Sequence, residues 1–219
     1  MGCECPKATA LTAIAATTCP EEIGQIQRFI FCRKGTVRFD TADPSSAKQI
    51  PASISVLTYL PSIVAPWDIL IALATNDKVI LTPLLGGDSS VSPGTQNTFG
   101  GGDNTTLNGE IYSLGFNPAD GTARFDSMTA AQTASMKLLV CEDLELYMVN
   151  ADGDIIGERD TLDADLWHGF DVSNVAFGGR NVQGYATRDS NVMTFQLDDD
   201  WDTKFEKQTP TDFNALTFN

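Results

Sequence analysis

The sequence predicts a mainly β protein with two short helices and a long glycine-rich loop. Alternating apolar and polar residues recur in runs of strand length, whereas only two segments have helical spacing. The stretch from Gly86 to Asn104 has almost no apolar side chains. With 219 residues and 42% hydrophobic content, the chain can bury its own core, which excludes intrinsic disorder. We expect one domain over residues 1–219, whose N-terminal segment, residues 1–22, contains cysteines.

The first half of the chain predicts a hairpin, a helix, a strand and the loop. Residues 25–33 alternate and contain Phe and Ile, so they read as a strand that a Lys-Gly turn joins to a second strand at 36–39. A proline at a first helical position begins a helix at 66–76, and a strand at 78–82 ends at a proline. Residues 86–106 form the extended loop, since they are rich in Gly, Ser, Asn and Thr.

The second half predicts further strands around the better of the two helices. Residues 107–116 give a strand, and the Asn-Pro-Ala-Asp-Gly turn at 117–121 precedes another at 122–125. Asp126 or Ser127 caps a helix that runs to about Cys141 on a mostly small apolar face. The remaining predicted strands are 144–149 and 154–159, joined by an Asn-Ala-Asp-Gly turn, then 171–177, 181–187, 191–197 and 215–218.

The charge of the chain is strongly acidic and uneven. The net charge is −15, and residues 142–219 hold 17 acidic and five basic side chains. A protein that grips phosphate backbones needs a basic face, so this class is disfavoured. This uneven distribution of charge suits subunits that meet through unlike surfaces, although two solvated faces explain it equally well. No apolar run reaches membrane-span length and no secretory signal is present, so we expect cytoplasmic synthesis and no membrane partner.

Motifs for catalysis or cofactor binding are missing from the sequence. His168 is the only histidine, and neither a nucleophile elbow nor a phosphate-binding or dinucleotide-binding glycine motif occurs. The five cysteines are odd in number and do not form paired zinc knuckles, which favours reduced thiols over a metal. Asn150, Asp152 and Asp154 have calcium-loop spacing, but Thr161 replaces the closing glutamate, so a hairpin turn is preferred. We expect no cofactor and no metal.

Two clusters leave alternatives open. Asp198, Asp199, Asp200 and Asp202 surround Trp201; they favour a solvated edge or a contact strip over paired catalytic carboxylates. The Trp-His-Gly-Phe run at 167–170 suits a ligand-stacking patch, although core packing or a subunit contact is the preferred interpretation.

Three stretches carry a resemblance to a known family. They are Cys19–Arg33 (CPEEIGQIQRFIFCR), Pro66-Trp67 before a helix leading into Lys78–Pro83 (KVILTP), and Phe99–Gly109 (FGGGDNTTLNG). Together they resemble proteins of tailed phages and prophages of the Bacteroidetes, whose layout is similar to that of tail tube proteins. The chain departs from that family in its cysteine-rich N-terminus and its strong acidity.

The resemblance implies a β-sandwich or partial barrel with a flanking helix, and six copies in a ring around a channel. The protein would then be a virion tail component, made in the host cytoplasm, whose partners are its own copies, other tail proteins and DNA in transit. The long loop would be the arm that reaches the next ring. The expected arm residues are Phe99, Gly100, Gly101, Gly102, Asp103 and Asn104, and the acids expected at the lumen or a contact are Asp198, Asp199, Asp200 and Asp202.

Two other functions stay open at this point. One is another head, neck or tail component with a similar β fold. The other is a glycan-binding β-sandwich that uses Trp167 and Trp201 as stacking surfaces. An enzyme is the least favoured class.

Overall fold

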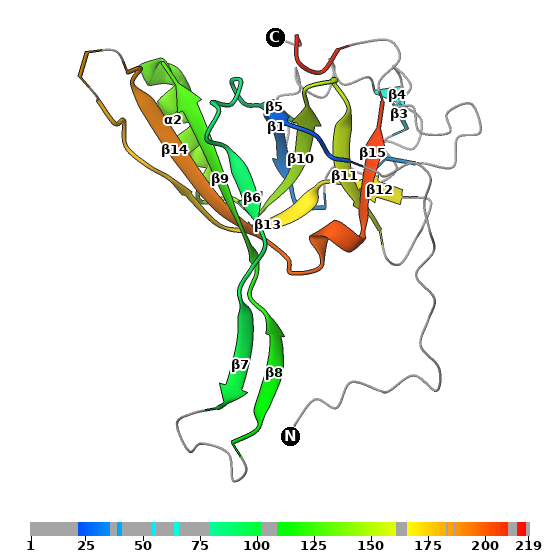
Figure 1. Ribbon diagram of the computed structural model, residues 1–219. Helices are drawn as coiled ribbons and strands as arrows, with labels where there is room; N and C mark the ends of the chain where they lie inside the picture. Colours follow the sequence, from blue (N-terminus) through cyan, green and yellow to red (C-terminus); the bar gives the residue numbers. More distant parts are fainter. Residues whose placement is uncertain are drawn as a thin grey trace. The chain divides into compact units, whose positions relative to one another are not determined.

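The computed structural model describes residues 22–35, 39–40, 54–55, 64–65, 79–101, 109–160, 166–182, 184–185, 187–209 and 214–217. The chain divides into two units (Figure 1). The smaller holds Thr95–Asn117, and the larger holds Ile23–Gly94 and Pro118–Asn219. The fold is mainly β, as the sequence predicted, and the sheets formed by the described residues are open.

The larger unit is built on one antiparallel sheet of 11 strands. Its main path runs β2-β12-β11-β10-β13-β14-β9-β6, while β1 pairs with β10 and β5, and β15 pairs with β11. The strands are β1 (Ile26–Arg33), β2 (Phe39–Asp40), β5 (Ile80–Leu81), β6 (Ser90–Ser92), β9 (Ala119–Asp126), β10 (Leu144–Asn150), β11 (Ile155–Arg159), β12 (Leu166–His168), β13 (Phe170–Phe177), β14 (Ser190–Leu197) and β15 (Phe205–Gln208). A separate pair joins β3 (Ile54–Ser55) to β4 (Val64–Ala65).

Strand β10 is the centre of this sheet, and all seven of its residues are buried. One edge of β10 pairs with β1 along its whole length. The other edge pairs with β13 at residues 144–146 and with β11 at residues 148–149. The sheet therefore branches at β10. The core packs over this branch, where the rings of Phe29 and Phe195 meet edge to face at 5.4 Å between centroids.

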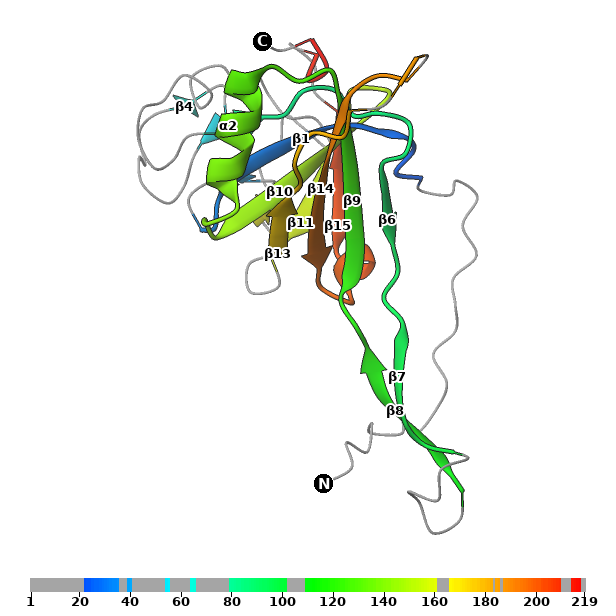
Figure 2. The same cartoon turned by 90° about the vertical axis from the view of Figure 1, so that its left-hand side faces the viewer.

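The one α-helix of the described residues is α2 (Ala130–Leu139), which contacts β13 (Figure 2). Its N-cap is Thr129 rather than Asp126 or Ser127, because Thr129 and Gln132 form a capping box. Only Met136 and Leu139 of the helix are buried, so the predicted apolar face is narrower than expected. The helix expected at 66–76 lies outside the described residues.

The turn predicted at 117–121 is wrong, because β9 already begins at Ala119. Alternate residues of β9 are buried, including Gly121, which lies opposite Phe195 of β14. A Cβ at Gly121 would lie 2.8 Å from Cδ2 of Phe195 and closer still to the ring edge. The glycine is therefore required for close packing of the ring and does not mark a turn.

Three more expectations need correction. Strand β2 pairs with β12, so it is not the hairpin partner of β1, whose edges pair with β10 and β5. The described part of 181–187 is a loop with a single bridge from Asn181 to Ser190, and 215–217 is a turn. By contrast, the strands predicted near 78–82, 144–149, 154–159, 171–177 and 191–197 are confirmed. Within the described residues, no helix combines the length and the hydropathy needed to span a membrane.

Candidate assembly surfaces

The predicted long loop contains strands rather than irregular structure alone. Residues 90–92 form β6, and the smaller unit is a hairpin of β7 (Gln96–Gly100) and β8 (Ile111–Phe116). The expected arm residues Phe99 and Gly100 belong to β7, and Gly101 follows with a φ of 100°. Gly102, Asp103 and Asn104 lie outside the described residues. Of the expected arm residues, Phe99 and Gly100 thus lie in a two-stranded hairpin.

Large apolar side chains are exposed on both faces of this hairpin. Phe99 lies opposite Tyr112, so these two rings share one face, while Gly100 lies opposite Ile111 on the other. The exposed fractions are 48% for Phe99, 67% for Ile111, 51% for Tyr112, 68% for Leu114 and 59% for Phe116.

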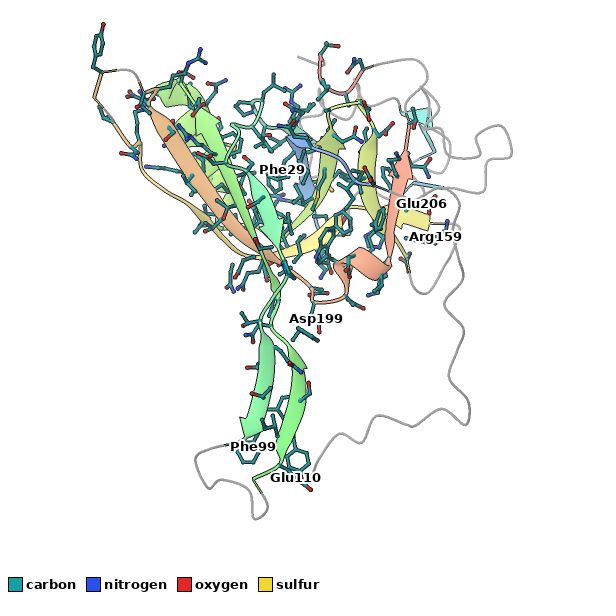
Figure 3. All side chains as sticks on the ribbon, viewed as in Figure 1. Phe29, Phe99, Glu110, Arg159, Asp199 and Glu206 are labelled. Carbon is teal, nitrogen blue, oxygen red and sulfur yellow. The ribbon has the colours of Figure 1, made fainter. Side chains whose placement is uncertain are left out.

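The hairpin carries few charged side chains that would favour its solvation. Glu110 is the only charged residue among its described positions, and its carboxylate accepts a hydrogen bond of 2.6 Å from the Tyr112 hydroxyl. Figure 3 shows Phe99 and Glu110 at the same end of the ribbon. An isolated two-stranded hairpin is marginally stable in water, and exposed apolar patches of this kind mark interaction surfaces. Sequence reasoning missed the exposure of Ile111, Leu114 and Phe116, because 111–116 alternates as if only one face were apolar. The bulge at Leu114, between the pairs Thr98–Ser113 and Asn97–Gly115, brings Phe116 to the face of Ile111.

The β6 edge of the larger unit's sheet carries no charged side chain. Among the described strands, β6 pairs with β9 alone. No charged residue occurs from Ser89 to Gly102, and Pro93 is the one blunting residue of that stretch. Edge strands of monomeric proteins normally carry charges that prevent pairing with another chain. The β6 edge therefore has no charge against pairing with another chain, and its three-residue length and Pro93 limit such pairing to a short segment.

The acidic cluster folds into one turn at the end of β14. Asp198 accepts a main-chain hydrogen bond from Trp201 of the short 3-10 helix η1 (Trp201–Thr203). Asp200 is paired with Lys204 at 2.7 Å, and this hydrogen bond is the main cause that raises the pKa of Lys204. Asp199, labelled in Figure 3, and Asp202 are exposed, and neither forms an ion pair within the described part of the chain. The structure thus brings the four predicted acids together.

The aromatic residues near 167–170 belong to the core. Trp167 and Phe170 are each 1% exposed, and Trp167 lies 5.0 Å from the ring of Tyr147. Trp201 is half-buried and packs edge to face on Phe170 at 5.6 Å, so it is less exposed than the sequence suggested. His168 is also buried, with Nδ1 2.7 Å from the Gly169 carbonyl oxygen. A sugar ring cannot stack on Trp167, which removes one of the two surfaces that a glycan site would use.

The residues with calcium-loop spacing form a hairpin turn. Oδ1 of Asn150 accepts from the main-chain nitrogens of Asp152 and Asp154 at 3.0 and 2.9 Å. The Asp154 carboxylate accepts from Thr209 at 2.7 Å and from Asn150 at 3.2 Å. Burial raises the pKa of Asp154, but these hydrogen bonds and the charge of Lys207 outweigh it and hold the pKa below its usual range.

Thr161 lies outside the described residues. Among the residues that the structure describes, no group of three or more His, Cys, Asp or Glu side chains could hold a metal ion. Of the five cysteines, the structure describes Cys32, which is buried and donates to the Glu145 carboxylate, and Cys141, which is exposed; neither is in a disulfide among the described residues.

Comparisons of the chain with protein families, with curated proteins and with solved structures gave no match.

Proposed function

We propose that this protein is a virion structural subunit of tail tube type, which assembles into stacked, six-membered rings that conduct DNA. The observation that carries the proposal is the β7–β8 hairpin, with large apolar side chains exposed on both faces and one described charge. A ribbon that exposes large apolar side chains on both faces is more stable in water when other chains cover both sides. Contacts repeated between copies supply that cover.

The open sheet edge supports the same function. The uncharged β6 edge can pair with a strand from a neighbouring copy, as strands do when subunits extend each other's sheets. Such pairing around a ring removes exposed edges from every subunit. A monomeric binding module gains nothing from an edge without charges.

The acidity of the chain suits a conduit. Proteins that hold DNA use lysine and arginine against phosphates, whereas this chain has a net charge of −15. An acidic wall repels the duplex, so DNA slides past without being retained. The same surfaces would serve another repeating component of the phage head, neck or tail, and the assembly formed by the purified protein separates these cases.

The test removes the hairpin and leaves the larger unit intact. Deleting residues 96–116 should preserve the larger unit, because Ser92 pairs with Asp120 outside the deletion. A deletion that began at Ser89 would be too large, since the Ser89 hydroxyl accepts from the Arg124 main-chain nitrogen and residues 90–92 form β6. Negative-stain microscopy should show rings or tubes for the full chain and none for the deletion variant.

Circular dichroism and urea unfolding of the deletion variant supply the control. An unchanged unfolding midpoint shows that the larger unit folds without the hairpin. A full chain that sediments as a monomer at every concentration contradicts the proposed function. Tubes that form equally well without residues 96–116 contradict the role of the hairpin.

A further inference from the structure

The loop between β13 and β14 ends in an exposed aromatic tip. Two main-chain hydrogen bonds between Asn181 and Ser190, at 2.7 and 3.1 Å, close the base of the loop. A further bond of 3.3 Å from the nitrogen of Thr187 to the oxygen of Gly184 forms a turn at the tip. Tyr185 in this turn is fully exposed, at 105% of its reference area. The tip is thus a hydrogen-bonded turn whose aromatic ring lies open to solvent.

The same loop is locally basic in the most acidic part of the chain. Arg180 and Arg188 are two of the five basic residues in 142–219. Arg180 is held at the base, where it donates to the Met128 carbonyl oxygen and lies 3.9 Å from Asp189. Arg188 is exposed, and no ion pair joins it to another residue that the structure describes. The loop therefore exposes three side chains, Arg188, Tyr185 and Val182, the last at 73%.

The acidic turn lies at the other end of the same strand. Strand β14 runs from Ser190, next to the loop, to Leu197, next to Asp198. Eight residues at about 3.4 Å each separate the two ends by roughly 25 Å. Figure 1 shows the loop and η1 at opposite ends of β14. One strand thus carries a basic aromatic tip at its start and an acidic turn at its end.

We propose that the β13–β14 loop of one copy docks on the acidic turn of the next copy, head to tail. Arg188 faces Asp199 and Asp202, two of the three acids of the turn (with Asp198) that form no ion pair among the described residues. Tyr185 covers the exposed part of Trp201, which is half-buried against Phe170. We assign a second copy as the partner because each copy carries both surfaces, the basic aromatic tip at one end of β14 and the acidic turn with Trp201 at the other, and these surfaces are complementary in charge.

A contact between unlike ends repeats in one direction, so it generates a closed ring or an open filament. The inference therefore rests on the proposed function, for which it supplies one of the subunit contacts. It is independent of the hairpin, which belongs to the other unit.

Charge reversal tests the contact. Arg188→Glu removes the basic end, and Asp199→Lys with Asp202→Lys removes the acidic end. In sedimentation velocity at low salt, each variant should need about tenfold more protein than the wild type to assemble, because a like-charge pair replaces an attractive one. A chain that carries all three changes has opposite charges across the contact again, so its assembly should return toward the wild-type threshold.

Mixing the two variants gives a second readout that only a head-to-tail contact produces. In an equimolar mixture, the intact tip of one variant meets the intact turn of the other, and the reversed tip meets the reversed turn with opposite charge. The mixture should therefore assemble near the wild-type threshold, although each variant alone does not. Lys137→Glu is the matched control, since Lys137 is exposed in the last turn of α2 and is not part of the proposed contact, so its reversal should leave the threshold unchanged.

The outcomes separate this contact from the proposed function. Wild-type assembly that the Arg188 and Asp199/Asp202 reversals leave unchanged overturns the contact alone. Reversals that weaken assembly without rescue in the triple variant overturn the pairing of these two ends. A wild-type chain that stays monomeric overturns both the contact and the proposed function.

Discussion

Phe99→Ser in the hairpin should weaken assembly by roughly 60-fold and leave the larger unit folded. Phe99 is 48% exposed, and an aromatic side chain presents about 200 Å², so about 100 Å² is available for burial against another chain. At about 25 cal/mol per Å², that burial contributes about 2.5 kcal/mol, which the serine loses. Each 1.4 kcal/mol is about tenfold in an association constant, so the fold-change follows.

The assay is the protein concentration at which assembly begins, measured by sedimentation velocity and checked by negative-stain microscopy. Thr98→Ser is the matched control, because Thr98 is the neighbouring exposed residue of β7 and points to the opposite face. Circular dichroism confirms that both variants are folded. Equal thresholds for the Phe99→Ser and Thr98→Ser variants would refute the assignment of the Phe99 face to an intersubunit contact.

Three further predictions concern stability, measured by urea unfolding. Gly157→Ala should cost about 3 kcal/mol, because its Cβ would collide with the His168 carbonyl oxygen and lie 2.8 Å from Trp167, whereas Gly179→Ala, in open space, should cost little. Asp154 has a lowered pKa in the folded state, so it stabilises the protein above its unfolded pKa of about 3.9. The difference in unfolding free energy between wild type and Asp154→Asn should therefore shrink as the pH falls through the folded pKa. A difference that does not change with pH contradicts this prediction. Arg159 in β11 pairs with Glu206 in β15 (Figure 3) but is half exposed, so Arg159→Ala should cost less than about 1 kcal/mol, and a larger loss would show that the pair is more than a surface bridge.

The β10–β11 hairpin was predictable because its turn chemistry is local. Gly153 has a φ of 87°, and the Asn150 side chain caps the turn nitrogens, so the Asn-Ala-Asp-Gly signal and the structure agree. The start of β9 was not predictable by the same rule. There Asp120 and Gly121 look like a turn, but long-range packing on Phe195 decides the conformation. Local signals fail where a distant ring requires a glycine.

The candidate surfaces were predictable in part. The acidic cluster is visible in the sequence, and the structure adds that Lys204 neutralises Asp200 and that Trp201 supports the turn from the core. The hairpin looked like an irregular arm, since Gly, Asn and Thr dominate β7 and weaken its strand signal. The exposure of Tyr185 could not be predicted, because an aromatic residue near β strands usually fills the core.

The branch at β10 sets the order in which the subunit can form during synthesis. Strand β1 leaves the ribosome early, yet its partner β10 begins at Leu144, more than a hundred residues later. Until then the only described partner of β1 is the two-residue strand β5 on its other edge, and pairings of such sequence separation form slowly. Strand β14, with the tip and the acidic turn at its ends, emerges later still. The β14 ends of a nascent chain are therefore completed only after the strands of the sheet centre have been made, so the proposed contact between copies can form only after the sheet centre exists.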